Sequence, residues 1–112
     1  MRAIRCVNYG EPSELRVENL EEPVPGPGQI LLDVEAAGLG YVDALLVRGT
    51  YQVKIPLPFV PGSEVAGVIE AVGEGVSSDL IGSRVMALSP RGALAEKVDI
   101  PAAVCSSIPD EM

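Results

Sequence analysis

The run QILLDVEAAGLGYVDALLVRG, residues 29–49, changes from the pattern of a strand to the pattern of a helix within a few positions. Its first nine residues, 29–37, alternate in the period of two that is typical of a β-strand. One face of this strand is apolar throughout: Ile30, Leu32, Val34 and Ala36. The opposite face carries Leu31, Asp33 and Glu35, and its two carboxylates mark it as the face open to water.

Residues 41–48 predict a short helix, and Gly49 is well placed to end it because glycine tolerates the left-handed conformation of a helix end. The i, i+4 spacing stacks a small set of apolar side chains: Tyr41 with Leu45, and either Val42 or Leu46. We therefore expect these residues to form the packed face of the helix.

The rest of the chain predicts short strands separated by turns, since its 12 glycines and 10 prolines are spread along the sequence as punctuation. The other expected strands are 2–7, 15–20, 63–72, 83–88, 94–100 and 103–108. Residues 21–28, with three prolines, and 50–62, with another three, predict loops. About seven strands and one or two short helices indicate a mainly β fold, either a barrel or a sandwich.

Composition sets limits on function. The 112 residues suit one domain, and 47% hydrophobic content is enough for a core. A net charge of −8 argues against nucleic-acid binding.

Because no targeting segment and no membrane span is evident, we expect a cytoplasmic protein that does not bind membranes. Cys6 and Cys105, far apart in sequence, are expected to be free thiols.

Several ordered motifs resemble one known family. They are AAGLGYVD (36–43), RGTY (48–51), PFVPGSEVAGV (58–68), VGEGV (72–76), GSRV (82–85) and GALAE (92–96). The chain resembles the N-terminal domain of medium-chain dehydrogenases/reductases, most closely the quinone oxidoreductase branch. This resemblance implies a GroES-like, partly open β-barrel with one or two short helices over residues 1–112. It also implies a separate Rossmann-type nucleotide-binding domain, which is absent from this chain.

The resemblance further implies that the domain binds no metal. Zinc-dependent relatives place a cysteine where this chain has Gly40 and a histidine where it has Ser63, and their proton-relay hydroxyl falls on Val42. Catalytic zinc needs about three protein ligands. The chain has no histidine, and no cysteine cluster for structural zinc lies between Leu88 and Leu94. Glu64, beside Ser63, is expected to be satisfied structurally within the core.

For NADPH, the resemblance implies contacts from four residues to the nicotinamide end: Gly40, Tyr41, Val42 and Leu45. Relatives usually have Asn at the position of Gly40 and often Tyr at that of Leu45, so two polar contacts are missing. Tyr51 is a candidate catalytic residue that either donates to a substrate carbonyl or packs on the barrel. Asp43 is either a carboxylate that stabilises the helix N-terminus or a residue that orients the wall of the cleft.

The function implied is hydride transfer from NADPH to a quinone or an enone, in an enzyme of which this chain alone is inactive. An enoyl-thioester reductase domain, free-standing or in a synthase, is the nearest alternative, although Arg48, Lys54 and Arg91 form no obvious basic cluster for it. A co-chaperonin-like, non-enzymatic domain is a remote alternative. We expect a homo-oligomer, with an exposed apolar patch around Leu45, Leu46, Val60 and Val104.

Overall fold

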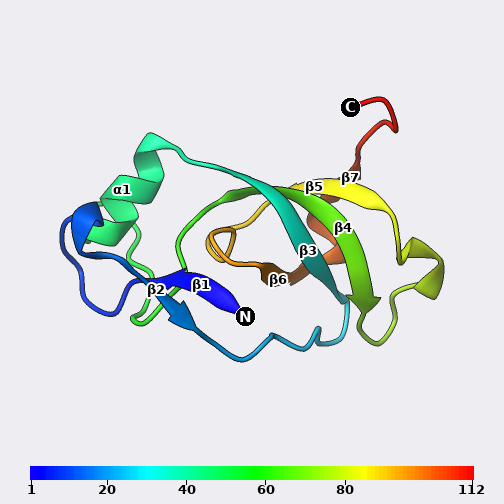
Figure 1. The fold of residues 1–112 in the computed structure, drawn as a ribbon, viewed down its shortest axis with the longest axis horizontal. Coiled ribbons are helices and arrows are strands. Elements are labelled where there is room, and N and C mark those ends of the chain that lie inside the picture. The colour runs from blue at the N-terminus through cyan, green and yellow to red at the C-terminus, as the bar shows by residue number, and fades with distance from the viewer.

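The computed structural model describes all 112 residues and is mainly β (Figure 1). The helices are α1 (Tyr41–Arg48) and three single 3-10 turns, η1 (Pro12–Glu14), η2 (Ser78–Leu80) and η3 (Ala102–Val104). The strands are β1 (Arg2–Arg5), β2 (Arg16–Asn19), β3 (Gln29–Gly38), β4 (Glu64–Val72), β5 (Arg84–Leu88), β6 (Lys97–Pro101) and β7 (Cys105–Ser107). The predicted number of strands is confirmed, whereas the structure has three 3-10 turns beside the one α-helix where one or two short helices were predicted.

Two antiparallel sheets make up the fold, and they do not close into a barrel. The larger sheet has the order β6-β3-β4-β5-β7, and the smaller one pairs β1 with β2. The segment before β6 joins them, because Ala3 bridges Ala95 and the Ile4 N–H donates to the Leu94 carbonyl at 2.9 Å. The expected partly open, GroES-like arrangement is therefore confirmed.

The larger hydrophobic cluster lies on one face of the five-stranded sheet. Its largest fully buried side chains come from the predicted apolar face of β3 and from the strands beside it: Ile30, Leu32, Ile69 and Ile100. Gly67 of β4 stands where the two central strands approach most closely, since a Cβ built there would overlap the Asp33 carbonyl oxygen. A glycine at this position lets β3 and β4 pair without a steric clash.

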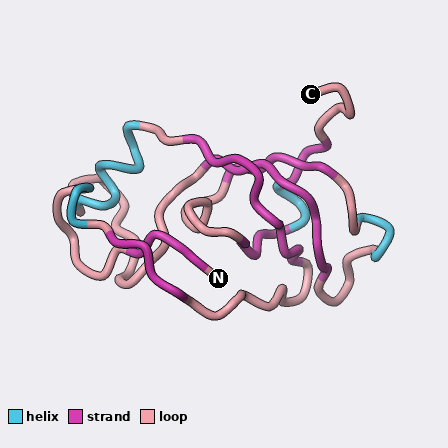
Figure 2. Tube along the Cα trace, viewed as in Figure 1, coloured by secondary structure: helices cyan, strands magenta, loops and turns pink.

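The smaller hydrophobic cluster lies at the other end of the molecule, where α1, η1 and long loops gather (Figure 2). It contains Cys6, Leu46, Val47, Ile55 and Phe59. The predicted bounds of α1 are confirmed, and Gly49 follows it with φ 72°.

The packed face of α1 differs from our prediction. Asp43, Leu46 and Val47 are buried, whereas Tyr41 is 77% exposed and Leu45 is only half-buried. Most positions of this helix are apolar, so their spacing does not select a face. The cluster around Phe59 selects Leu46 and Val47.

Two strand predictions also need correction. Leu31, expected on the wet face of β3, is 6% exposed, and a register shift opposite Leu31 and Leu32 breaks the strict alternation there. The strand expected over 94–100 begins only at Lys97. Residues 94–96 instead make the connection to β1.

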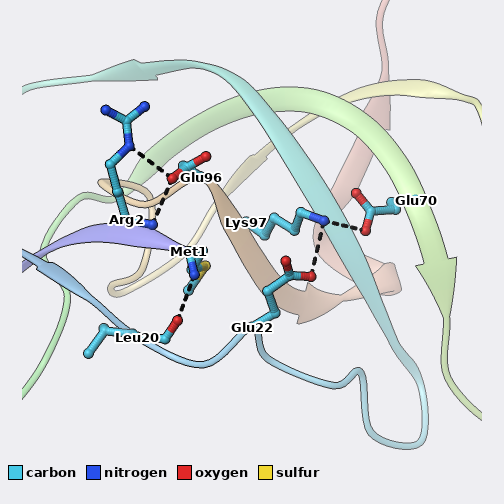
Figure 3. A network of polar contacts seen from close by, with 7 residues as sticks. All are labelled: Met1, Arg2, Leu20, Glu22, Glu70, Glu96 and Lys97. Carbon is cyan, nitrogen blue, oxygen red and sulfur yellow. Dashed lines mark hydrogen bonds and ion pairs between the residues drawn. The ribbon is translucent and has the colours of Figure 1, made fainter.

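A polar network ties the edge of the larger sheet to the segment after β2 (Figure 3). The Lys97 Nζ lies 2.7 Å from a Glu70 oxygen and 3.1 Å from a Glu22 oxygen, and these hydrogen bonds raise the pKa of Lys97. Glu96 accepts from the Arg2 backbone N–H at 2.7 Å and from its guanidinium at 3.1 Å, which lowers the pKa of Glu96. These pairs link β6 to β4 and to the segment after β2, and the residue before β6 to β1.

Candidate functional site

The start of α1 is organised around the Asp43 carboxylate. One carboxylate oxygen accepts from the Gly40 N–H at 2.8 Å, and the other accepts from the Ser63 hydroxyl at 3.1 Å. Asp43 is 8% exposed, so both bonds lie largely away from water. The carboxylate thus caps the helix and ties it to the residue that precedes β4.

This geometry brings Gly40 and Ser63 together, the two positions that carry zinc ligands in the zinc-dependent relatives. Here one carboxylate links them through a backbone amide and a hydroxyl. No group of three or more His, Cys, Asp and Glu side chains in the structure could hold a metal ion. That the protein binds no zinc stays a prediction.

Beside this junction lies an open cavity of about 390 Å³, within the range of ligand-binding pockets. Three parts of the chain line it: α1, the loop 50–63, and the turn after β5. The lining residues are Val42, Leu46, Tyr51, Val53, Ile55, Ser63, Leu88, Ser89 and Pro90. Because most of these side chains are apolar, the cavity suits an apolar molecule with few polar atoms.

The structure brings Val42 and Tyr51 to the same cavity, as the resemblance implied. Tyr51 is half-buried against the smaller cluster, and its phenol makes no hydrogen bond within the chain. The ring of Tyr51 therefore packs on the domain while its hydroxyl group stays free, and donation to a substrate carbonyl stays a prediction. Asp43 adjoins the cavity through Ser63, whereas Gly40, Tyr41 and Leu45 do not line it.

Leu88 is a site residue that the sequence analysis missed, together with Ser89 and Pro90 after it. The signal was present in the strand pattern, because β5 is apolar on both faces. Val85 and Ala87 face the core, whereas Met86 is 52% and Leu88 69% exposed. A strand with two apolar faces indicates that the second face also meets a ligand or another protein surface.

That exposed face of β5 forms the floor of a second apolar cavity, of about 580 Å³. Met86, Leu88 and the 45% exposed Val104 line it beside Glu64. The expectation that Glu64 is satisfied within the core is wrong, because its carboxylate is exposed and makes no hydrogen bond or ion pair. Of the four residues expected to form an exposed apolar patch, Val104 is exposed, Leu45 and Val60 are half-buried and Leu46 is buried.

A third cavity, of about 470 Å³, is more polar and does not fit the predicted site. It is lined in part by Arg5, Lys97 and Asp99, and none of the candidate residues reaches it. Arg5 pairs with Glu18 at 3.5 Å, and Lys97 is held by its two glutamates. Arg91 also lines this cavity and makes no ion pair, but none of the predicted site residues lies in it, so the apolar cavity at Tyr51 is the stronger candidate.

Comparison with known proteins agrees with the fold. The family described as "Alcohol dehydrogenase GroES-like domain" matches residues 26–110. The chain belongs to this family. The expected resemblance to the quinone oxidoreductase-type reductases is thereby confirmed.

Relatives of this GroES-like domain include two kinds of protein. The synaptic vesicle membrane protein VAT-1 homolog of Rattus norvegicus is 47% identical over 114 residues, which is all of this chain and 28% of that protein. A probable quinone oxidoreductase of Schizosaccharomyces pombe is 38% identical over 110 residues, 97% of this chain and 33% of that protein. The chain therefore spans about a third or less of the length of these relatives.

Among solved structures, the quinone oxidoreductase of Thermus thermophilus, described also in complex with NADPH, superposes with a TM-score of 0.84. It is 36% identical, and the match covers all of this chain and 34% of that one. No helix of the GroES-like domain is long and apolar enough to cross a membrane. The cytoplasmic location and the homo-oligomer stay predictions, and one relative is named as a vesicle membrane protein.

Proposed function

We propose that this GroES-like domain is the substrate side of an NADPH-dependent reductase that transfers hydride to a quinone or an enone. The observation that carries the proposal is the apolar cavity in which Val42 and Tyr51 meet. A quinone is flat, apolar on both faces and polar only at its oxygens. Apolar walls with one free phenol match that chemistry. The names of relatives give further support.

The residues of this chain contribute positioning and electrostatics. Bound NADPH supplies the hydride. As the substrate is reduced, negative charge develops on its carbonyl oxygen, and a hydrogen bond from the Tyr51 phenol stabilises that charge. Apolar walls exclude water and so strengthen this hydrogen bond. Asp43 acts as a positioning residue, since both its oxygens are engaged in holding Gly40 and Ser63.

The fit to NADPH is limited to its nicotinamide end. Val42, 39% exposed, lines the cavity, and Tyr41, 77% exposed, precedes it on α1 outside the lining; both would contact the nicotinamide ring. The Gly40 amide is already used by Asp43, and Leu45 is half-buried on the helix. The chain has no glycine-rich phosphate loop, and its net charge of −8 opposes an anionic ligand. The rest of the cofactor needs residues outside this chain.

We assign the binding of the rest of NADPH to a Rossmann-type nucleotide-binding domain that covers the exposed face of β5. The side chains of this face, Met86, Leu88 and Val104, form an apolar surface of the kind that docks another domain. Glu64 stands among them without a partner, and we expect it to pair with a basic side chain or backbone amides of the second domain. Because the chain spans only about a third or less of these relatives, they are long enough to contain such a domain.

The site is tested by titrating the chain with tetramethyl-1,4-benzoquinone while recording amide shifts by NMR. We expect the largest shifts at Val42, Tyr51 and Leu88, and Tyr51→Phe should weaken binding about fivefold, as for one lost hydrogen bond. Shifts confined to Lys97 and Asp99 would place the ligand in the polar cavity and contradict the proposal.

The reaction is tested in the longer protein that carries this domain, by following NADPH consumption with the same quinone. Tyr51→Phe should lower kcat/KM about tenfold or more because a donor to the developing charge is lost. Val24→Ala, which removes an 84% exposed side chain far from the cavity lining, should leave the rate unchanged. Equal rates for Tyr51→Phe and the wild type would remove Tyr51 from the mechanism.

A further inference from the structure

The loop that carries Tyr51 has almost no hydrogen bonds of its own. Between Tyr51 and Pro58 no backbone amide or carbonyl takes part in a backbone–backbone hydrogen bond. One hydrogen bond alone reaches this stretch, from the Tyr9 phenol to the Ile55 carbonyl, and at 2.6 Å it is short. The conformation of the loop therefore depends on this contact and on the packing of a few apolar side chains.

Tyr9 also meets the loop at its beginning. The Gly49 backbone lies against the Tyr9 ring so closely that a Cβ built on Gly49 would be 2.8 Å from the ring Cγ. The Lys54 ammonium lies over the same ring, 5.5 Å from its centroid. One aromatic side chain thus contacts residues 49, 54 and 55, on either side of Tyr51.

The segment around Tyr9 is itself anchored to the body of the domain. Cys6 and Phe59 exchange two backbone hydrogen bonds, of 2.8 and 3.0 Å. The Gly10 amide donates to the Val47 carbonyl at 3.0 Å, and Glu11 pairs with Arg48 at 3.1 Å. Figure 1 shows this first part of the chain, with η1, beside α1. Segment 6–11 is therefore fixed both to the end of α1 and to the end of the loop.

We infer that Tyr9 is a positioning residue for the substrate cavity: it holds the loop 49–55 in the form that presents Tyr51 and Val53 to the ligand. The inference rests on the proposed function for what the cavity binds, but the contacts of Tyr9 stand without it. A cavity wall preorganised in this way binds its ligand without the entropic cost of ordering a loop.

The test compares Tyr9→Phe, which keeps the ring and removes the bond to Ile55, with the wild-type chain. Backbone order parameters of residues 51–55 should fall from about 0.85 toward about 0.6. Binding of tetramethyl-1,4-benzoquinone should weaken about fivefold. The amides of Leu32 and Ile69 in the larger sheet should exchange as slowly as before, which separates a local effect from general destabilisation.

Ser77→Ala is the matched control, because it removes a side-chain hydrogen bond to the backbone in an exposed turn of η2. This substitution should change neither the order parameters of residues 51–55 nor the affinity for the quinone. Unchanged order parameters in Tyr9→Phe would overturn the inference, and so would a mobile loop with unchanged quinone affinity. If the wild type binds no quinone, the proposed function fails on its own, while the order parameters still decide whether Tyr9 fixes the loop.

Discussion

At the scale of a single residue, Asp43 shows how a position singled out in the sequence makes specific hydrogen bonds in the fold. Two interpretations were open, a carboxylate that stabilises a helix N-terminus and a residue that orients the cleft wall. In the structure the Asp43 carboxylate caps Gly40 and also binds Ser63, which confirms the first interpretation, while a role in orienting the cleft wall stays a prediction. The sequence predicts the capping from position alone, whereas the bond to Ser63 joins residues 20 positions apart and depends on the tertiary fold.

Replacing Asp43 tests this arrangement. Asp43→Ala leaves the Gly40 amide and the Ser63 hydroxyl without their partner, and we expect the free energy of unfolding to fall by about 2 kcal/mol. Asp79→Ala, which removes an exposed carboxylate without a side-chain hydrogen bond, should change it little. Urea denaturation of the wild type, Asp43→Ala and Asp79→Ala measures the free energy of unfolding of each. Equal free energies for the wild type and Asp43→Ala would show that the two bonds contribute nothing to stability.

Glu96 provides a prediction on pH. Hydrogen bonds from the Arg2 backbone and then from its side chain lower the pKa of Glu96. A carboxyl whose pKa is lower in the folded state stabilises the fold fully above its unfolded pKa, and that contribution is lost as pH falls through the lowered value.

Glu96→Gln should therefore make stability less dependent on pH at the acid end. Urea midpoints between about pH 3 and pH 7 measure this, with Glu111→Gln, an exposed residue without an ion pair, as the control. If the urea midpoints of Glu96→Gln and the wild type change with pH in parallel, the contact with Arg2 does not lower the pKa of Glu96. Lys97 acts in the opposite sense, because its raised pKa stabilises the fold below the ordinary lysine pKa and that contribution is lost at higher pH.

At the scale of the element, α1 shows which features a sequence determines by itself. Its bounds were predicted because Gly40 and Gly49 flank an unbroken run of helix-compatible residues. Its packed face was not, because apolar residues surround the helix and only the cluster of Cys6 and Phe59 decides between them. Likewise, 94–96 has the alternation of a strand, but it pairs with β1 instead of extending β6.

The end of α1 can be tested with two glycines that share a backbone conformation. Gly49 has φ 72° and Gly75 has φ 84°, so an alanine at either is strained by about 1 kcal/mol. Only at Gly49 does a new Cβ also meet another group, the Tyr9 ring. Gly49→Ala should therefore destabilise the chain by about 1 kcal/mol more than Gly75→Ala, measured by thermal or urea unfolding. Equal losses would mean that the Tyr9 ring moves freely.

At the scale of the whole molecule, the sequence predicted the fold class more fully than the cleft. The positions of the strands along the chain follow from patterns that each segment carries, such as the apolar face of β3, whereas their order in the sheet does not. The cavity at Tyr51 depends on three segments that meet only after folding, so Leu88 and Pro90 could not be assigned to it from spacing. The prediction that Glu64 lies in the core was wrong for a related reason. Its neighbours Met86 and Leu88 on β5 are apolar, but they are exposed in this chain.

The isolated chain should bind NADPH no more tightly than about 1 mM, which corresponds to about −4 kcal/mol. Tyr41 and Val42 offer contacts to the nicotinamide alone, while the charge of −8 repels the phosphates. Calorimetry with NADPH measures this. A micromolar dissociation constant would show that the chain carries a phosphate site that we have not recognised, whereas weak binding agrees with a cofactor held mainly by another domain.

The molecule has two hydrophobic clusters, one built on the five-stranded sheet and one around Phe59, and the cavity borders the smaller one. This separation has a consequence for how such a domain changes over generations. Substitutions near Tyr51 can alter the shape of the cavity while the larger cluster preserves the fold, and distant, independent sites combine nearly additively. Changes confined to the cavity lining that leave the buried residues of both clusters intact can therefore alter what the cavity admits over generations, with little loss of stability.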